Sequence, residues 1–371
     1  MNCHQYNVYM RVLIIFNHPA PYKVNVFNEL SKLIDLTVIF ERTKESDRPD
    51  SFYGNQKYEF EAITLKDGYI GKWGSISNNV RKYIKNQYHE YDYILMNGYS
   101  HLAEIKAIRY MAKHKIKFGL LINGGIIKSK ECSLKKNYKT SIVNKASYYL
   151  SPSQKSNEYL EYYGADPSKI HNYCYSNFFY KDITSPSKNE KLEARKKFGL
   201  PLEGKIFINP SQFIERKNNL YLISLFKDRK DTLVLVGDGP LKSKYEEYIA
   251  EHKMTNVFIL PFLKKEDLFY LYKACDIHIT LSKEDIFGHT VLEAFANGLP
   301  VISSNKVISA LEYVKDGYNG YLVDLNNEKQ IKEALEKCDN SLSDNAIKSA
   351  QKNTFENSAL SIYQILKDLH E

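Results

Sequence analysis

The chain has 371 residues, which at roughly 100–200 residues per domain suggests two domains. Its 52 Lys and Arg against 44 Asp and Glu give a formal net charge of +8, and 43% of its residues are hydrophobic, enough for substantial cores. Basic chains favour polyanions such as nucleic acid, an anionic membrane or phosphorylated small molecules. No segment resembles a nucleic-acid-binding module, so we expect no nucleic-acid partner.

The cysteines and the N-terminal residues indicate the cellular compartment of the protein. The five cysteines form no CxxC pair and are odd in number, which argues against a disulfide framework or a structural zinc site and is typical of a reducing cytoplasm. The N-terminus is polar up to Met10, so we expect no signal peptide. No run of about 20 apolar residues occurs, so we expect no membrane span. The sequence predicts a cytoplasmic protein.

The first half alternates between apolar runs and helical spacing. The run 11–16 ends at the turn-forming residues 17–21, residues 24–33 have helical spacing, and 35–40 is a second strand, which makes a βαβ unit. Residues 93–96, 117–122 and 147–151 are further strand candidates. Such alternation predicts a parallel sheet with helices on both faces.

The second half repeats this pattern after residues 175–187, which lose periodicity and are predicted to form the linker. Its strand candidates are 205–209, 232–236, 257–260, 277–281 and 300–303. The predicted fold class is therefore α/β, with two doubly wound Rossmann-like domains at 1–182 and 183–371. The final helix is a candidate to pack back on the N-terminal domain. Because ligands bind outside the carboxyl ends of such strands, two domains that face each other would form a cleft.

The most informative stretch is 282–301, which follows a predicted strand. Gly288 allows a ligand to approach the backbone, and the N–H groups of His289, Thr290 and Val291 would open a helix that suits a diphosphate. Glu293, one turn in, can accept hydrogen bonds from ribose hydroxyls. Asp285 or Glu284 can hold hydroxyls of a sugar. The alternative is a surface acidic loop before an ordinary capped helix.

This stretch resembles the donor-binding signature of the retaining family-4 glycosyltransferases, the group 1 glycosyl transferases of the GT-B fold. The matches are Phe287-Gly288, Glu293-Ala294 and the residues 298–301, Gly-Leu-Pro-Val. Asp285 and Glu293 keep the family spacing of seven intervening residues, with Asp where the family has Glu, and Glu284 is one residue further away. The resemblance implies two domains that face a cleft, an N-terminal acceptor-binding domain and a C-terminal donor-binding domain.

The resemblance extends to other parts of the second half. Lys217 fits the family lysine that reaches the diphosphate, Gln212 stands where an Arg is usual, and Arg216 is placed to compensate. Gly237 and Gly239 lie in a strand-ending turn beside the donor, and Phe262 ends the segment that receives the base. The predicted catalytic set is Asp285, Glu293, Lys217 and Arg216.

We expect no metal and no cofactor. No Asp-x-Asp motif occurs, which suits neutralisation of the diphosphate by side-chain cations and a helix start.

The first half resembles the family more loosely. Residues 19–30 resemble a variant of polysaccharide-building members, in which Pro21, Tyr22 and Lys23 face acceptor or donor, with packing as the alternative for Tyr22. Many relatives carry a His after the strand equivalent to 117–122. Here Asn123, Gly124 and Gly125 stand there instead, with an amide and bare backbone N–H groups to offer. His101 is another cleft candidate, although a lone His is more often structural.

The sequence thus predicts an enzyme that moves a sugar from a nucleoside-diphosphate sugar, UDP being favoured, to a glycan or lipid-linked acceptor. The resemblance implies retention of anomeric configuration and a role in bacterial capsule, O-antigen or exopolysaccharide synthesis. The alternatives are a non-catalytic nucleotide-sugar-binding partner of another transferase, or a GT-B epimerase, phosphorylase or hydrolase. A dinucleotide-dependent oxidoreductase is disfavoured because no GxGxxG loop follows the first strand.

A lipid-linked acceptor suggests peripheral contact with the inner face of the plasma membrane. The candidates for this contact combine basic charge with an aromatic ring, the alternative being a solubilising face. They are Lys128, Lys130, Lys135, Lys136, Tyr138 and Lys139.

Overall fold

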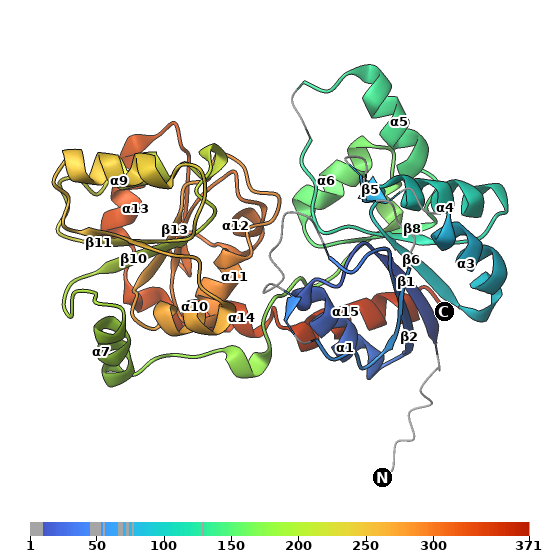
Figure 1. Ribbon diagram of the computed structural model, residues 1–371, viewed down its shortest axis with the longest axis horizontal. Helices are drawn as coiled ribbons and strands as arrows, with labels where there is room; N and C mark the ends of the chain where they lie inside the picture. Colours follow the sequence, from blue (N-terminus) through green and yellow to red (C-terminus); the bar gives the residue numbers. More distant parts are fainter. Residues whose placement is uncertain are drawn as a thin grey trace, which may run out of the picture. The chain divides into compact units, whose positions relative to one another are not determined.

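The computed structural model describes residues 10–44, 53–54, 56–65, 70–71, 74–75, 78–127 and 130–370. It divides the chain into two compact units (Figure 1), Met1–Tyr175 with Phe355–Glu371, and Ser176–Thr354. Each unit has its own hydrophobic core.

The N-terminal unit is built on a seven-stranded parallel sheet in the order β3-β2-β1-β6-β7-β8-β9. The strands run as near-continuous buried apolar stretches, as parallel strands covered on both faces do. The two outer strands β3 and β9 are short, and the sequence prediction missed them. The strands are β1 Arg11–Phe16, β2 Asp35–Phe40, β3 Glu61–Thr64, β6 Tyr93–Asn97, β7 Gly119–Leu121, β8 Tyr148–Ser151 and β9 Ile170–Asn172, and a separate antiparallel pair is β4 Ile70–Gly71 with β5 Gly74–Ser75.

Helices connect these strands and cover the sheet. They are α1 Pro21–Ser31, α3 Asn79–Gln87, α4 Leu102–Lys113, α5 Ser133–Val143, α6 Gln154–Tyr162 and, from the end of the chain, α15 Phe355–Asp368. The last of these packs along α1 (Figure 1), and Ser361 on it accepts a hydrogen bond from the backbone N–H of Cys174 at 3.0 Å. The end of the chain is therefore part of the N-terminal unit.

The C-terminal unit holds a six-stranded parallel sheet in the order β12-β11-β10-β13-β14-β15. All five strands predicted for this half are present, with ends within a residue of those expected. The strands are β10 Ile206–Pro210, β11 Thr232–Val236, β12 Val257–Leu260, β13 Ile277–Thr280, β14 Val301–Ser304 and β15 Gly320–Val323. The helices are α7 Lys188–Lys197, α8 Asn219–Ser224, α9 Lys242–Glu251, α10 Lys265–Tyr272, α11 Thr290–Ala296, α12 Ile308–Tyr313, α13 Glu328–Lys337 and α14 Ser343–Gln351.

The division between the units falls after Tyr175, whereas the sequence placed it after residue 182. Hydrogen bonds explain the difference. Asn177 donates from its side-chain amide to Glu293 and accepts at its backbone carbonyl from Lys265, both of which belong to the second unit. The segment that loses periodicity is thus already held by the C-terminal unit.

A buried carboxylate fixes the start of β13. Asp276 is 6% exposed and accepts hydrogen bonds from Arg195 at 2.8 Å, from the backbone N–H of Ile206 at 2.8 Å and from Asn340 at 2.9 Å, with Lys191 as a further partner. Charged and hydrogen-bonded partners of this kind offset the cost of burying a carboxylate. The strand that leads to residues 282–301 is therefore tied to α7 and β10.

Candidate functional site

In each sheet, the chain order reverses between two neighbouring strands. In the C-terminal unit this happens between β10 and β13, because β11 and β12 extend the sheet on one side and β14 and β15 on the other. In open α/β sheets, ligands bind outside the carboxyl ends of the strands at such a switch point. The loops that leave β10 and β13 carry Lys217 and Asp285, two residues of the predicted catalytic set.

The structure brings these two side chains together. The Lys217 ammonium donates to Oδ2 of Asp285, and both side chains are largely buried, at 13% and 15% exposure. Arg216 lies with Nη1 3.9 Å from Oδ1 of Asp285 and donates to the backbone carbonyl of Glu284 at 3.3 Å. The side chain of Glu284 is exposed. Of the two adjacent acids, it is Asp285 that lies against the cations.

The loop conformation explains why both cations lie on the same side. A single 3-10 turn, Glu215–Lys217, follows β10, and Asn218 adopts a left-handed conformation (φ 59°) before α8 starts. The two loops are also joined by backbone, since the Lys283 N–H donates to the Arg216 carbonyl at 2.8 Å. Asp285 itself is fixed by its N–H, which donates to the Lys306 carbonyl at 3.1 Å. The charge pair therefore rests on a hydrogen-bonded backbone.

The helix start differs from the prediction. The Val291 N–H donates to the Gly288 carbonyl at 3.3 Å and the Val291 side chain is fully buried, so the prediction of a free N–H at Val291 is wrong. The chain tightens into a three-residue turn before α11, which uses that donor internally. His289 and Thr290 are partly exposed, and Phe287 is buried against the Tyr313 ring at 6.4 Å.

Gly288 is required by packing inside the unit. It has φ +84°, and a Cβ there would meet Cγ1 of Val307 at 2.6 Å and Oγ of Ser309 at 3.1 Å. Ser309 also donates to the Gly288 carbonyl at 2.7 Å. The sequence predicted that the missing side chain leaves room for a ligand. In the structure it leaves room for Val307 and for Ser309 of α12.

The turn after β11 packs on the loop after β10. A Cβ on Gly237 would lie 2.0 Å from the Ser211 carbonyl oxygen, and one on Gly239 would lie 2.6 Å from that of Phe213. The two glycines thus let the turn and the loop that leads to Lys217 come into contact. Gln212 on that loop is exposed, and Phe262, after β12, keeps 65% of its surface exposed.

Glu293 is held by residues that the sequence did not single out. Asn177 donates to its Oε1 at 2.5 Å, and the Lys265 ammonium lies on the carbonyl of Asn177 at 2.7 Å and 3.6 Å from Asp182. Burial raises the pKa of Glu293, while the charge of Lys265 and the Asn177 hydrogen bond act in the opposite direction. Asn177 lies in the aperiodic segment, where no sequence pattern marks it.

His278, on β13, is a second residue without a sequence signal. Its ring is fully buried, with Nε2 3.4 Å from the Thr290 hydroxyl. Burial, and after it the charge of Lys217, lowers the pKa of His278 to about 3. A neutral imidazole thus lies behind the Lys217 ammonium and adds no charge to it.

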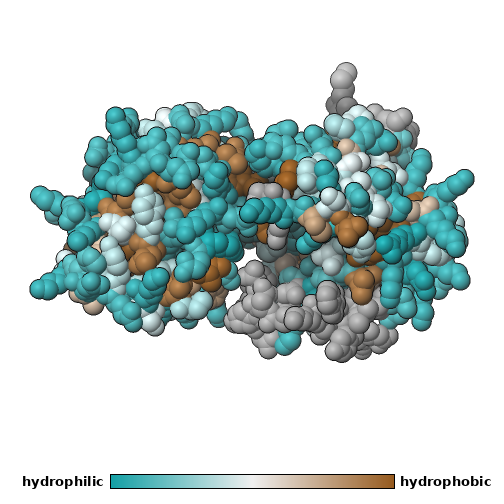
Figure 2. All heavy atoms as spheres, turned by 90° about the horizontal axis from the view of Figure 1, so that it is seen from above, coloured by the Kyte–Doolittle hydropathy of each residue, from teal (hydrophilic) through white to brown (hydrophobic). Residues whose placement is uncertain are grey.

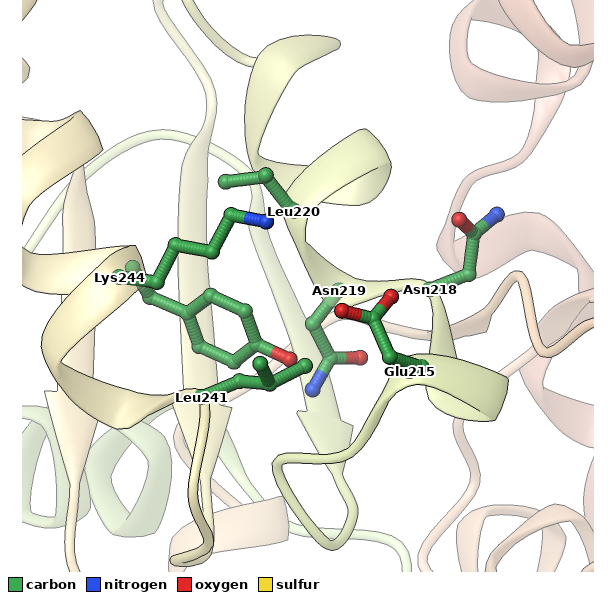
Figure 3. A pocket seen from close by; sticks show the side chains of 7 residues that line it. Glu215, Asn218, Asn219, Leu220, Leu241 and Lys244 are labelled. Atoms are coloured by element: carbon green, nitrogen blue, oxygen red, sulfur yellow. The ribbon is translucent and has the colours of Figure 1, made fainter.

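A pocket lies beside the same loop. It is lined by Glu215 and Asn218 of that loop and by residues of α8 and α9, and in Figure 3 the side chains of Glu215 and Asn219 lie close together while Lys244 approaches from α9. Lys217, Asp285 and Glu293 are not among its lining residues, so it is separate from the predicted donor residues.

In the N-terminal unit, Pro21 is the first residue of α1 and Lys23 is buried, at 4% exposure. The Lys23 ammonium lies 4.4 Å from the centre of the Tyr175 ring, 5.6 Å from that of Tyr173 and 6.0 Å from that of Tyr22. Burial lowers the pKa of Lys23 to about 7. Contact with aromatic faces partly offsets the cost of burying the cation.

The loop after β7 reaches the same group of aromatic rings. The Tyr173 hydroxyl donates to the Ile122 carbonyl at 2.9 Å and lies 3.5 Å from the Asn123 side-chain oxygen, while Asn123 donates to Asn97 at 2.9 Å. Lys23 and Asn123 are thus connected through Tyr173 at the carboxyl ends of β1, β6 and β7.

The glycines of that loop differ in role. A Cβ on Gly125 would lie 2.4 Å from the Tyr159 ring, so Gly125 is required by packing, and Gly124 has φ +139°.

His101 belongs to a different group. It precedes α4 and lies beside two glutamates, with Nδ1 3.7 Å from Glu41 and 3.8 Å from Glu104. Burial raises the pKa of Glu41 to about 9 and that of Glu104 to about 7, and burial followed by the charge of Arg42 lowers the pKa of His101 to about 4. This group thus places three buried titratable side chains beside one another.

Comparison with known proteins identifies the C-terminal unit. Residues 190–353 match the model of the family described as glycosyl transferases group 1. This part of the C-terminal unit is similar to the group 1 glycosyl transferases. The chain is 26% identical over 165 residues to an uncharacterized glycosyltransferase of Methanocaldococcus jannaschii, covering 43% of this chain and 47% of that protein. It is 29% identical over 146 residues to the O-antigen biosynthesis glycosyltransferase WclY of Escherichia coli, covering 39% and 40%. It thus spans less than half the length of these two relatives.

Solved structures show the fold of the whole chain. Anabaena HepE, in a complex with UDP and glucose, superimposes with a TM-score of 0.72 at 18% identity and covers 98% of this chain and 99% of that one. A glycosyltransferase of Rickettsia africae superimposes with a TM-score of 0.75 at 19% identity and covers 97% and 100%. The chain therefore has the GT-B fold, with its two Rossmann-like sheets.

The packing role of Gly288 gives a prediction that two glycines of the C-terminal unit can test. Gly288 and Gly204 have nearly the same φ, +84° and +82°, but a Cβ on Gly204 meets nothing within 4 Å. Gly204→Ala should cost about 1 kcal/mol, the cost of left-handed backbone strain alone, and Gly288→Ala should add an overpacking cost of about 1–3 kcal/mol. Calorimetry of both variants measures the difference in their free energies of unfolding. Equal destabilisation would show that the Val307 side chain moves aside at no cost in stability.

Proposed function

We propose that this chain transfers a sugar from a nucleoside-diphosphate sugar to a glycan or a lipid-linked saccharide, with retention of anomeric configuration. The observation that carries the proposal is the convergence of Lys217 and Arg216 on Asp285 at the β10–β13 switch point of a group 1 glycosyl transferase domain. Two cations at the carboxyl ends of parallel strands suit a doubly charged leaving group.

Lys217 and Arg216 act on the leaving group in this proposal. When the bond between the sugar carbon and the diphosphate oxygen breaks, negative charge develops on that oxygen, and preorganised cations stabilise it. The acceptor hydroxyl oxygen forms the new bond on the same face, and its proton passes to the departing diphosphate. Asp285 then accepts hydrogen bonds from the sugar hydroxyls, in place of part of its contact with Lys217.

Glu293 is assigned to the ribose. Its Oε1 is held by Asn177, which leaves Oε2 to accept from ribose hydroxyls. Phe262 offers an open ring for the base. Two similar proteins support uridine as the base. HepE was solved with UDP. A Streptococcus pneumoniae relative is named as the GtfA subunit of a UDP-N-acetylglucosamine–peptide N-acetylglucosaminyltransferase; it is 25% identical over 211 residues, which cover 53% of this chain and 39% of that protein.

The acceptor is proposed to bind the N-terminal unit, at the carboxyl ends of β1, β6 and β7. Lys23, Tyr22 and Asn123 lie there with a cation, a ring and an amide for a saccharide or its phosphate. A role in surface polysaccharide assembly is supported by relatives named for O-antigen and lipopolysaccharide core biosynthesis, WclY and Rhizobium meliloti LpsE.

The transfer step is proposed to need no divalent metal, because Lys217 and Arg216 supply the neutralising charge. Initial rates measured with and without EDTA should agree within error. Loss of transfer on chelation, with recovery on adding magnesium or manganese, would contradict this assignment.

Lys217 is the most direct test of the leaving-group assignment. Lys217→Ala should lower the rate of transfer by on the order of 10²–10³, since it removes one preorganised charge contact. Lys283→Ala is the matched control, because Lys283 is exposed in the neighbouring loop and should leave the rate near that of the wild type. Product analysis by NMR reports the anomeric configuration. Near-normal turnover of Lys217→Ala would remove Lys217 from the site.

Peripheral membrane contact is also proposed, through α5 and the residues before it. Among the described residues, no helix combines the length and apolar content that crossing a bilayer requires, and the face seen in Figure 2 is mostly hydrophilic with scattered apolar patches. The segment Ser133–Val143 contains no acidic residue, and its Leu134 and Tyr138 are 83% and 43% exposed. Such a helix combines apolar side chains with basic charge, as interfacial helices do.

The candidate lysines differ in how far their ammonium groups are available to a membrane surface. Lys130 and Lys135 are exposed, and Lys136 is partly buried over the Tyr162 ring at 3.7 Å. Lys139 is bound to Glu131 at 2.7 Å and to the Tyr163 hydroxyl at 2.8 Å, so it is committed inside the unit. Lys128 lies outside the described residues.

Vesicle co-sedimentation tests this contact. Binding should rise with anionic lipid and fall with salt, since each Lys near the surface contributes about 1 kcal/mol and is screened. Lys135→Glu with Lys136→Glu should weaken binding. Lys196→Glu with Lys329→Glu, which changes net charge equally at exposed positions of the C-terminal unit, should not. Equal recovery of the protein with neutral and with anionic vesicles would contradict the proposed membrane contact and would not affect the transferase proposal.

A further inference from the structure

Three potential metal ligands converge at the carboxyl ends of β2 and β6. Glu41 directly follows β2, His101 precedes α4, and Glu104 lies in the first turn of α4. His101 Nδ1 is 3.7 Å from Glu41 Oε2 and 3.8 Å from Glu104 Oε1, and the three ligand atoms lie within 4.8 Å of one another. The end of β2 and the start of α4 thus bring one imidazole and two carboxylates together.

The burial of these groups calls for a counter-charge. The Glu41 side chain is 1% exposed and the Glu104 side chain 3%. Neither oxygen of Glu41, nor Nδ1 of His101, has a hydrogen-bond partner in the part of the chain that the structure describes. Buried polar atoms are nearly always paired, and buried carboxylates are paired with cations or coordinate metals. A buried carboxylate without donors, Glu41, beside a second buried carboxylate, Glu104, therefore points to a cation.

Glu104 is already oriented for such a role. Its Oε2 accepts the backbone N–H of His101 at 3.0 Å, which turns Oε1 toward the imidazole. A hydrogen bond to the second oxygen of a carboxylate ligand fixes its direction, as outer-shell partners of metal ligands do. Glu41 provides the second carboxylate oxygen from the carboxyl end of β2.

We propose that Glu41, His101 and Glu104 form a binding site for a divalent transition-metal ion, with zinc as the best fit. Zinc bonds of roughly 2.0–2.2 Å to imidazole nitrogen and carboxylate oxygen place tetrahedral ligand atoms about 3.3–3.6 Å apart. The observed separations of 3.7 and 3.8 Å need only a small inward movement. Cysteine is not among the ligands, so the cysteine spacing that argues against a structural zinc site does not bear on this one.

Arg42 competes with the metal in this site. Its Nη2 lies 3.5 Å from Nε2 of His101, on the other side of the ring. A metal on Nδ1 leaves the ring proton on Nε2, which then faces the guanidinium donor, so the metal-bound state requires Arg42 to turn away. Arg42→Gln removes the competing charge and offers an acceptor to the Nε2–H. It should raise zinc affinity by on the order of tenfold.

Zinc content tests the site directly. The full chain is equilibrated with Zn²⁺, dialysed and analysed by atomic absorption. The wild type should retain one more zinc ion per chain than either Glu41→Gln or His101→Gln. The matched control is His89→Gln, which changes an exposed histidine beside Glu90 and should retain as much zinc as the wild type. Bound Co²⁺ should give visible absorption in the wild type that is absent from Glu41→Gln.

Melting temperatures separate metal loss from misfolding. Glu41→Gln replaces a buried carboxyl group by a neutral amide of nearly the same size and should fold, with a melting temperature that does not respond to chelator. The wild type should melt lower in EDTA than with Zn²⁺, although transfer below that temperature continues. Equal zinc content in wild type and Glu41→Gln, or a wild-type melting temperature insensitive to both zinc and EDTA, would show that protons neutralise the two carboxylates and would overturn the proposal.

Discussion

The ion pair between Lys217 and Asp285 joins two loops that are 68 residues apart in the chain. It forms because β10 and β13 are neighbours in a parallel sheet, so the loops that leave their carboxyl ends meet. The ammonium and the carboxylate are both largely buried, and each stabilises the charge of the other. Either group alone would carry the full free-energy cost of desolvation. The side chains that we propose to bind a diphosphate and a sugar are thus kept in place before any ligand arrives.

Much of that support is backbone. The loop after β10 is held against the turn after β11 at positions where only glycine fits, and the loop after β13 is pinned to Lys306 and α12. Asp276 fixes the beginning of β13 through partners on α7 and β10. Preorganisation of this kind is what electrostatic stabilisation of a leaving group requires, because charges that must first be reoriented by the ligand stabilise it less.

The sequence predicted the strands of the C-terminal unit well because parallel strands covered on both faces are nearly continuous apolar runs, as at 232–236. Through the resemblance to a family it also named Lys217 and Asp285 as donor-site residues, but it did not predict that their side chains contact each other. It missed the edge strands β3 and β9, whose short exposed sequences carry no such pattern. It could not foresee the bond from Asn177 to Glu293, since nothing local marks an aperiodic asparagine.

Two positions of the motif also have uses inside the protein. Gly288 was assigned to ligand approach, and its missing side chain leaves room for Val307; the Val291 N–H was assigned to a diphosphate, but it closes a turn. A motif gives the residue type at a position and cannot tell whether the space around that position belongs to a ligand or to the protein. For the end of the chain, the sequence named the final helix as a candidate to pack on the N-terminal domain, and in the structure α15 packs along α1.

Binding of nucleotides tests the central claim most directly, because it requires no knowledge of the acceptor. The melting temperature of the wild type is measured with UDP, other nucleoside diphosphates and a panel of their sugars. A ligand at 100 times its Kd stabilises the bound unit by about 2.7 kcal/mol. The account predicts that one diphosphate and its cognate sugar nucleotide raise the melting temperature, and that Glu293→Gln reduces the shift for both. The absence of any shift across the panel, or an unchanged shift in Glu293→Gln and Lys217→Ala, would contradict a donor site between the β10 and β13 loops.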